Sequence, residues 1–187
     1  AQKQELTLTV KAVQDIIEHD ALTGLFNRRH MQILLQAEMD RCQRSGHRFC
    51  IALVDLDHFH DVNATFGYPT GDHVLRRFSE IARNSVRLTD WLARYGGEEF
   101  CLVMPDTDLA TAARVAERLR AQVEAAEIHS IDRRPIALTV SIGVAAWPGA
   151  SSGSDPDIDR LMVAADRALY AAKAQGRDRV VADKDTG

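Results

Sequence analysis

The chain has 187 residues, 45% of them hydrophobic and 27% charged, and its net charge is -4 at pH 7. This length fits one substantial domain, and the composition is ordinary for a globular protein. The slight acidic excess argues against broad nucleic-acid binding, which usually shows as a basic surface. No apolar run reaches the length of a membrane span, and the sequence shows no secretory leader. Because the first residue is Ala1, we expect a piece of a longer protein.

The first apolar residues recur at gaps of four, three and four, which is the spacing of a short coiled-coil seam. These residues are Leu6, Val10, Val13 and Ile17. Two heptads are too few to exclude an ordinary amphipathic helix, and both alternatives stay open. Either one predicts a helix ahead of Asp20.

The next elements follow from capping and apolar patterning. Asn27 is typical of a helix N-cap ahead of apolar residues at helical spacing. The near-continuous apolar run from Phe49 to Leu56 predicts a central strand buried on both faces. A short helical piece follows and stops at Gly67, before a longer helix with an apolar stripe from Val74 to Ala82.

The second half of the chain alternates between the same kinds of element. We expect a hairpin over 91–104 with Gly96-Gly97 at its turn, a helix over 110–126, a strand over 136–147, a surface loop over 151–157, a helix over 158–175 ended by Gly176, and a short strand at Val180-Val181. This alternation, with a hairpin in its middle, predicts one α/β sandwich around a central mixed sheet.

Acidic residues gather at two predicted strand ends. Asp55 and Asp57 stand at the carboxyl end of the buried strand, where ligands collect in open α/β sheets. Glu98 and Glu99 follow Gly96-Gly97, where a solvated hairpin tip with positive φ angles at the glycines is the plainer interpretation. If hairpin and strand are neighbours, the carboxylates need a cation to stay ionised together. Oxygen ligands without a His or Cys cluster suit Mg²⁺ or Mn²⁺ with substrate phosphates, rather than zinc.

This pattern makes phosphoryl transfer the physical hypothesis, and the absence of GxxxxGK excludes a P-loop enzyme.

RYGGEEF, with DLDHFHDVNATFGYPTGD and DALTGLFNRR upstream of it, resembles the GGDEF family of diguanylate cyclases in a GGEEF variant, from about Asp20 to Arg179. The resemblance implies an α/β (α+β) fold with a central mixed five-stranded sheet flanked by helices, like polymerase palms and nucleotidyl cyclases. It also implies that two GTP molecules become cyclic di-GMP and two pyrophosphates, through metal-assisted attack of a 3′-hydroxyl on an α-phosphate. We expect a linker helix over 1–19, a catalytic domain over 20–183 and a tail over 184–187.

The resemblance also implies roles for individual residues. The metal ligands are Asp55, Glu98 and the carbonyl of Leu56, supported by Glu99, and the metal is Mg²⁺ or Mn²⁺. Glu98 also accepts the proton of the attacking hydroxyl, and Glu99 and His60 complete the catalytic set. The expected substrate-binding residues are Phe59, Asn63, Tyr68, Asp72, Gly96, Gly97, Lys173 and Arg177.

Several of these roles have a structural alternative. A carboxylate at Asp72 can accept from N1-H and the N2 amino group of guanine, which disfavours adenine, but Asp72 also fits a helix N-cap. Asn63, the other guanine reader, also fits an exposed turn. Lys173 and Arg177 hold the β- and γ-phosphates in the family, whereas a basic helix end complementing the helix dipole is the common alternative. Glycines at the turn let the main chain approach the triphosphate closely.

Three positions depart from the family pattern. His60 replaces a Lys that stabilises charge on the reacting phosphates, Ala64 replaces an Asp, and Tyr68 replaces a His. Because imidazole is mostly neutral at pH 7, His60 predicts weaker or pH-dependent turnover. The Tyr68 contact with substrate is in doubt.

A second pattern, RxxD, ends at Asp90, with five residues between it and Gly96. Arg87 and Asp90 occupy the family's product-inhibition site, and Arg118 matches an arginine that completes it in some members. Arg can grip phosphate or guanine with paired donors, and Asp can accept from guanine. Taken alone, such a pair is usually a surface ion pair worth little.

Three functions are therefore weighed. The leading hypothesis is an active diguanylate cyclase. It works as a homodimer, takes GTP as substrate and is inhibited by cyclic di-GMP. A cyclase-derived module that binds cyclic di-GMP, and a regulatory domain that binds GTP without turnover, are the alternatives. We expect an upstream sensor domain, and we do not expect nucleic acid as a partner.

The three scattered cysteines (Cys42, Cys50 and Cys101) lack zinc or disulfide spacing, so we expect reduced thiols and a cytoplasmic location.

Overall fold

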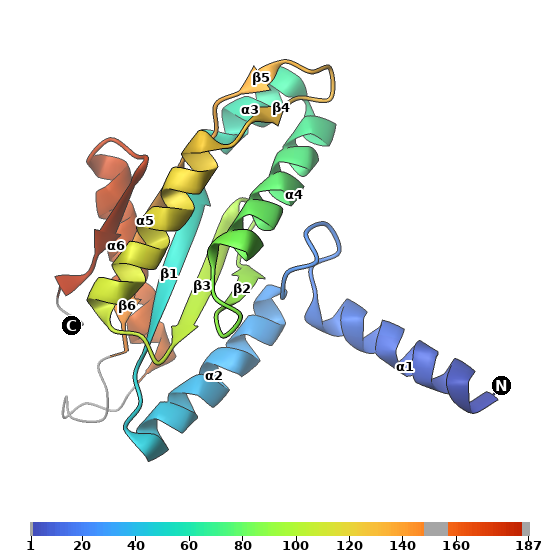
Figure 1. The fold of residues 1–187 in the computed structure, drawn as a ribbon, viewed down its shortest axis with the longest axis vertical. Coiled ribbons are helices and arrows are strands. Elements are labelled where there is room, and N and C mark those ends of the chain that lie inside the picture. The colour runs from blue at the N-terminus through green and yellow to red at the C-terminus, as the bar shows by residue number, and fades with distance from the viewer. Residues whose placement is uncertain (1, 148–156, 185–187) are drawn as a thin grey trace.

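The computed structural model describes residues 2–147 and 157–184, which form helices on both faces of one sheet (Figure 1). The helices are α1 (Gln2–Glu18), α2 (Arg28–Ser45), α3 (Phe59–Phe66), α4 (Tyr68–Ser85), α5 (Leu109–Ala125) and α6 (Ile158–Ala174). The strands are β1 (Phe49–Leu56), β2 (Trp91–Arg94), β3 (Glu99–Pro105), β4 (Ile128–His129), β5 (Pro135–Ile136), β6 (Val140–Ala146) and β7 (Arg179–Ala182).

The main sheet has five strands in the order β2-β3-β1-β6-β7. Strand β1 runs antiparallel to both β3 and β6, and β6 runs parallel to β7. The predicted mixed five-stranded sheet is confirmed, with β1 at its centre.

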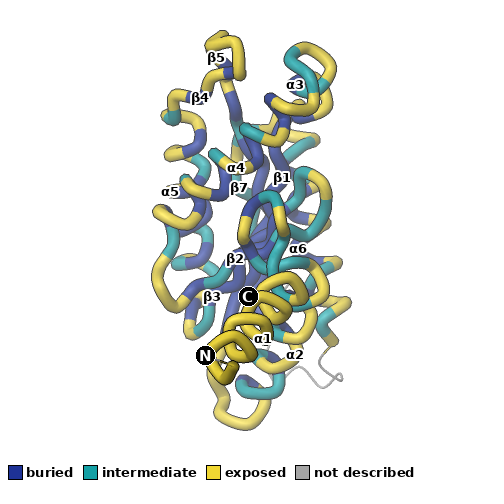
Figure 2. The backbone as a smooth tube through the Cα atoms, turned by 90° about the vertical axis from the view of Figure 1, so that its right-hand side faces the viewer, coloured by how far each residue is buried: buried dark blue, intermediate teal, exposed yellow. Residues whose placement is uncertain are grey.

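Every residue of β1 is buried, as the apolar run predicted. Alternate side chains of a strand point to opposite faces, so β1 serves two cores. Ala52 and Val54 join the core under α4 and α5, whereas Ile51 and Leu53 join the core under α2 and α6. Figure 2 shows this buried centre, enclosed by helices whose outer sides are exposed. Because helices cover both faces of β1, the strand is held firmly in the sheet, and its acidic carboxyl end lies at the edge of that sheet.

The ends of α2 carry the expected capping groups. The Asn27 side chain accepts a hydrogen bond from the backbone N–H of His30 at 2.9 Å, which confirms the predicted N-cap. Gly46 ends the helix with φ of 69°, and its N–H donates to the carbonyl of Cys42. Left-handed backbone at this position suits glycine.

Helix α1 projects away from the rest of the chain (Figure 1) and contains no buried residue. Its predicted helical state is confirmed. The side chains of the heptad pattern are all exposed, with exposed fractions of 65% at Leu6, 50% at Val10, 49% at Val13 and 53% at Ile17. No described helix has the length and hydropathy needed to cross a bilayer.

The strand predicted over 136–147 is wrong in one respect, because the segment forms two strands in different sheets. Ile136 in β5 pairs with Ile128 in β4, and this unpredicted hairpin is held to α4 by a 3.3 Å hydrogen bond from Ile131 N to Thr70 Oγ1. Only β6 continues in the main sheet. The loop predicted over 151–157 lies outside the described residues except for Asp157, which caps α6.

Gly143 in β6 fixes how closely α6 can approach the sheet. A Cβ at this position would lie 2.2 Å from both the Ala165 carbonyl oxygen and the Leu169 nitrogen, which are backbone atoms of α6.

We expect Gly143→Ala to lower the free energy of unfolding by about 3 kcal/mol, since the helix must shift. Urea unfolding measures this loss. Gly97→Ala, with no atom within 4 Å of the added methyl, is the control, and equal stability of the two variants would contradict the packing argument.

Candidate active site

A cleft of about 310 Å³ opens at the carboxyl end of β1. The antiparallel register places Asp55 opposite Glu99, and the backbone N–H of Leu56 donates to the Glu98 carbonyl at 3.2 Å. The strand end and the hairpin are therefore neighbours, as the acidic pattern required. The cleft is lined by Asp55, Leu56, Asp57, His58, Phe59, His60, Asp61, Glu98, Lys173 and Arg177.

The carboxylate of Asp55 lies buried in this cleft. One oxygen, Oδ2, is ion-paired with Lys173 Nζ from the end of α6. The other oxygen, Oδ1, is buried and has no hydrogen-bond partner among the described residues. Because buried polar atoms are nearly always satisfied in native proteins, this oxygen marks a place for a water or a cation.

Glu98 faces the same cleft and is held in an unfavourable environment for a charge. Burial raises the pKa of the Glu98 carboxyl, and the nearby carboxylates of Asp55 and Glu99 raise it further. The positive charge of Lys173 and the ring of His60 act in the opposite direction but do not offset the rise. A bound cation at this point would relieve the repulsion among the acids.

The carboxylate of Asp57 is held by hydrogen bonds from other parts of the chain. It accepts hydrogen bonds from Thr139 Oγ1 and Ser141 Oγ, both at 2.7 Å, and from the backbone N–H of Asp178 at 3.1 Å. Asp57 lines the cleft with Asp55 and Glu98, as the acidic cluster predicted, but its oxygens already accept hydrogen bonds from residues far along the chain, so it offers no free oxygen to a metal.

The described residues contain no group of three or more His, Cys, Asp and Glu side chains arranged to hold a metal. Asp55 and Glu98 offer two interacting carboxylates at the cleft, beside the main chain of Leu56. Mg²⁺ is usually held by one or two carboxylates together with waters and substrate phosphates. The Asp55 oxygen that lacks a partner in the described part of the chain, and the repelled charge of Glu98, therefore fit a divalent metal.

The Gly-Gly turn of the hairpin works differently from a tight turn with positive φ angles. Neither Gly96 nor Gly97 adopts the left-handed region, so that plainer interpretation is wrong. The N–H groups of Tyr95 and Gly96 both donate to the Glu99 carbonyl, at 2.8 and 3.0 Å. A Cβ on Gly96 would lie 2.7 Å from Glu99 Oε2, whereas Gly97 is open. Glycine at position 96 thus gives room to the Glu99 side chain.

Asn63 and Asp72 lie on the two helices beyond the cleft. The Asn63 Oδ1 atom is buried without a hydrogen-bond partner among the described residues, and it lies so close to Gly71 that a Cβ there would approach it to 1.8 Å. Asp72 is exposed inside α4, which begins at Tyr68. Asp72 is therefore not the helix cap that the alternative proposed. Tyr68 is 77% exposed.

The sequence interpretation missed two residues that line the cleft, His58 and Asp61. His58 has φ of 56° at the N-terminus of α3, where the chain turns sharply after β1. Their place inside the DLDHFHD run could have indicated them, since this run joins the strand to the helix.

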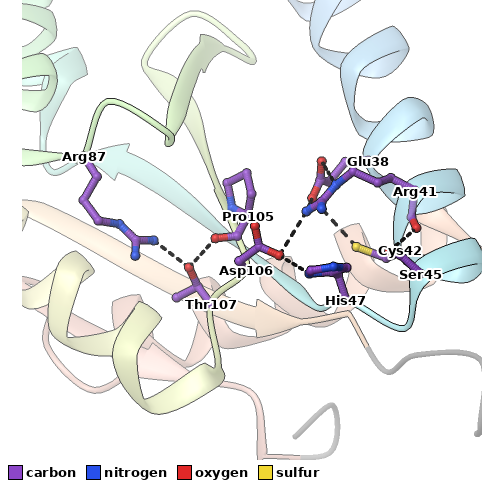
Figure 3. Close-up of polar contacts among 9 residues, drawn as sticks. All are labelled: Glu38, Arg41, Cys42, Ser45, His47, Arg87, Pro105, Asp106 and Thr107. Carbon is purple, nitrogen blue, oxygen red and sulfur yellow. Dashed lines mark hydrogen bonds and ion pairs between the residues drawn. The ribbon is translucent and has the colours of Figure 1, made fainter.

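Arg87 and Asp90 form a closed pair away from the cleft. Arg87 Nε and Nη2 donate to the two oxygens of Asp90 at 3.1 and 2.9 Å, and the Asp90 side chain has no exposed area. Figure 3 shows Arg87 also pointing to Thr107, whose Oγ1 accepts from Nη2 at 2.5 Å and donates to the Pro105 carbonyl. The bond to Asp90 raises the pKa of Arg87. This is a more fixed arrangement than a surface ion pair.

Arg118 reaches the same region from α5. Its Nη2 donates to the carbonyl of Ser85, two residues before Arg87. The structure thus brings Arg118 to the end of α4 but gives it no direct contact with Arg87 or Asp90.

The fold and the acidic cleft are those of an α/β domain with a site for a charged ligand at its sheet edge. A sequence model of the family described as diguanylate cyclase, GGDEF domain, matches residues 17–179. The chain belongs to this family.

Two curated relatives show the extent of the likeness. Diguanylate cyclase DosC of Escherichia coli (strain K12) is 36% identical over 181 residues, which cover 95% of this chain and 38% of DosC. Response regulator PleD of Caulobacter vibrioides is 43% identical over 163 residues, which cover 87% of this chain and 35% of PleD. The chain therefore spans less than two fifths of the length of either relative.

A solved structure extends the likeness to the fold. The crystal structure of the coiled coil and GGDEF domain of DgcB from Caulobacter crescentus in complex with c-di-GMP has a TM-score of 0.88 and 30% sequence identity. The comparison covers 97% of this chain and 93% of that one.

The raised pKa of Glu98 predicts a stability effect whose sign depends on pH. Above this pKa the folded state holds an ionised Glu98 at a cost that the unfolded state does not bear, and the cost disappears as the carboxyl is protonated. We expect Glu98→Gln to have a higher melting temperature than the native protein at pH 8 in EDTA, with the gap closing toward pH 4. Glu127→Gln, an exposed control, should leave the melting temperature unchanged. A native protein as stable as Glu98→Gln at pH 8 would show that Glu98 bears no such cost.

Proposed function

We propose that this domain is a diguanylate cyclase that condenses two GTP molecules into cyclic di-GMP and two pyrophosphates. The observation that carries the proposal is the buried Oδ1 of Asp55, which has no hydrogen-bond partner among the described residues. It lies beside Glu98 in a cleft that Lys173 and Arg177 also line. Such a cleft suits a metal and a polyphosphate together. The relatives named as diguanylate cyclases support the same reaction.

In this proposal the metal is Mg²⁺ or Mn²⁺, held by Asp55, Glu98 and the carbonyl of Leu56, with Glu99 behind them. A metal bound there would supply polarisation of the α-phosphate and a lower pKa for the attacking 3′-hydroxyl. Glu98 accepts the proton of this hydroxyl, and its raised pKa makes it a better acceptor than an ordinary glutamate.

Lys173 and Arg177 bind the β- and γ-phosphates, and both line the cleft. Lys173 is ion-paired with Asp55, so its ammonium group lies beside the carboxylate that would hold the metal and is within the cleft that would take the phosphates. Asn63 offers its unpartnered Oδ1 to a guanine donor, and the exposed carboxylate of Asp72 can accept from N1-H and the N2 amino group. Phe59 and Tyr68 flank the nucleotide, and Gly96 and Gly97 allow the main chain to approach the triphosphate.

One cleft of this size holds one GTP, so two domains must face each other in a twofold arrangement to form the product. Helix α1, with every apolar residue of its heptad pattern exposed, is the natural pairing element. The DgcB structure with its coiled coil supports this role.

We assign 1–19 to this linker helix, 20–183 to the catalytic domain and 184–187 to a tail. GTP as substrate and three free cysteines suit the cytoplasm.

We expect the protein with GTP and Mg²⁺ to form cyclic di-GMP, with a specific activity that rises with protein concentration because two domains must meet. Glu98→Gln should lower turnover by at least about 100-fold, since a ligand and a proton acceptor are lost together. Liquid chromatography of the nucleotides measures both effects, and circular dichroism checks the fold. GTP binding without turnover at any concentration would instead favour the regulatory domain. Binding of cyclic di-GMP without turnover would favour the cyclase-derived binding module, and His60 in place of Lys is the observation that motivates both alternatives.

We further propose that cyclic di-GMP inhibits the enzyme at Arg87 and Asp90, with Arg118 nearby. The buried carboxylate of Asp90 holds the Arg87 guanidinium with its outer side exposed, ready for a guanine edge or a phosphate. The DgcB complex with c-di-GMP supports ligand binding by this fold. Because this pair does not line the cleft, inhibition should not compete with GTP.

We expect Arg87→Ala to weaken product inhibition by about tenfold or more, because one charge-assisted hydrogen bond contributes about 1.5–3 kcal/mol, while the KM for GTP stays within twofold. Initial rates at rising concentrations of cyclic di-GMP measure the inhibition. Arg114→Ala, exposed on α5, is the matched control. Inhibition of Arg87→Ala equal to that of the native protein would remove this site.

A further inference from the structure

The turn after α6 has an unusual backbone. Gly176, Arg177 and Asp178 have φ angles of 114°, 63° and 45°. Two successive non-glycine residues in the left-handed region cost about 1 kcal/mol or more each. Such a turn persists only when its surroundings hold it in place, and its central residue is Arg177, which lines the cleft.

The start of the turn is held by α6 itself. The N–H of Gly176 donates to the Lys173 carbonyl at 3.2 Å, and the N–H of Arg177 donates to the Ala172 carbonyl at 3.0 Å. The guanidinium of Arg177 has no hydrogen-bond or ion-pair partner within residues 2–147 and 157–184. Its backbone is thus fixed while its donors remain available.

The end of the turn is held at the main chain by Asp57. The Asp178 N–H donates to Asp57 Oδ2, and Asp57 is itself only 6% exposed and anchored by Thr139 and Ser141. Because all of these partners lie at the ends of β1 and β6, the turn is tied directly to the strand that carries Asp55.

The side chain of Asp178 is held from another direction by Arg120 on α5. Arg120 Nη1 pairs with Asp178 Oδ1 at 2.6 Å, and the Arg120 side chain is only 14% exposed. Arg120 is oriented in turn by Glu117 and Glu124, at 2.9 and 2.8 Å. A partly buried network of this kind restrains a side chain more than an exposed pair does.

We infer that Asp57 and Arg120 are positioning residues that clamp Asp178 at its amide and its carboxylate, and so aim Arg177 at the β- and γ-phosphates of the nucleotide. This inference rests on the proposed function, because it requires Arg177 to bind phosphate. Arg120 is the better residue to test, since it does not line the cleft, whereas Asp57 follows the proposed metal ligands directly.

The experiment uses 3′-deoxy-GTP with Mg²⁺, because this analogue keeps the triphosphate but lacks the attacking hydroxyl. We expect Arg120→Met to weaken its binding by about fivefold, a usual size of coupling between a ligand and a remote residue. Binding of GMP, which lacks the β- and γ-phosphates, should be unchanged. Isothermal titration calorimetry measures both affinities. Arg114→Met on the same helix, which bonds only to Thr111 nearby, is the control and should match the native protein.

The decisive comparison is made in an Arg177→Ala background. If Arg120 acts through Arg177, adding Arg120→Met to Arg177→Ala causes no further loss of 3′-deoxy-GTP affinity, and Arg120→Lys recovers most of the single-variant loss. A further loss in the Arg177→Ala background, or no loss from Arg120→Met alone, overturns the clamp. If Arg177→Ala itself leaves the affinity unchanged, the proposed role of Arg177 fails instead. Urea unfolding verifies that each variant is folded, and Arg120→Gln, with the same expected loss, replaces Arg120→Met if that variant is not.

Discussion

The antiparallel pairing of β1 with β3 is the constraint on which the rest of the site depends. It places Asp55 opposite Glu99 and bonds Leu56 to the Glu98 main chain, so acids 43 positions apart meet at one edge of the sheet. Their mutual repulsion and burial disfavour ionised Glu98. Since β1 is covered on both faces, neither strand can move to relieve the repulsion. A cation is the direct physical means of relieving it.

Basic residues from α6 complement this acidic edge. Lys173 offsets part of the charge of Asp55, and leaves the second oxygen of that carboxylate unpartnered within the described part of the chain. The turn that follows carries Arg177, and it is held by Asp57 at the cleft and by Arg120 on α5, outside the cleft. The geometry around the cleft therefore depends partly on a residue that does not line it.

Regular elements were well predicted because their signals are local. The apolar run of β1, the Asn27 cap and Gly67 each act within a few residues, and all have the expected structural effect. The strand over 136–147 was predicted as continuous because its bend depends on pairing with β4, which a propensity pattern does not contain. The plainer interpretation of the Gly-Gly turn, a tip with positive φ angles, is wrong about these angles. Sequence cannot show that the Glu99 side chain occupies the space beside Gly96.

The sequence by itself determined the class of fold, the hairpin that presents two glutamates and the set of charged residues from which the cleft is made, since each is encoded in a contiguous motif. Only the tertiary structure decided how the two aspartates divide their roles. One oxygen of Asp55 has no partner within residues 2–147 and 157–184, whereas Asp57 is satisfied by residues 82, 84 and 121 positions away. In sequence the two are equivalent neighbours of one strand end. Their difference arises from which distant donors the folded chain brings to each carboxylate, and no local pattern records that distance.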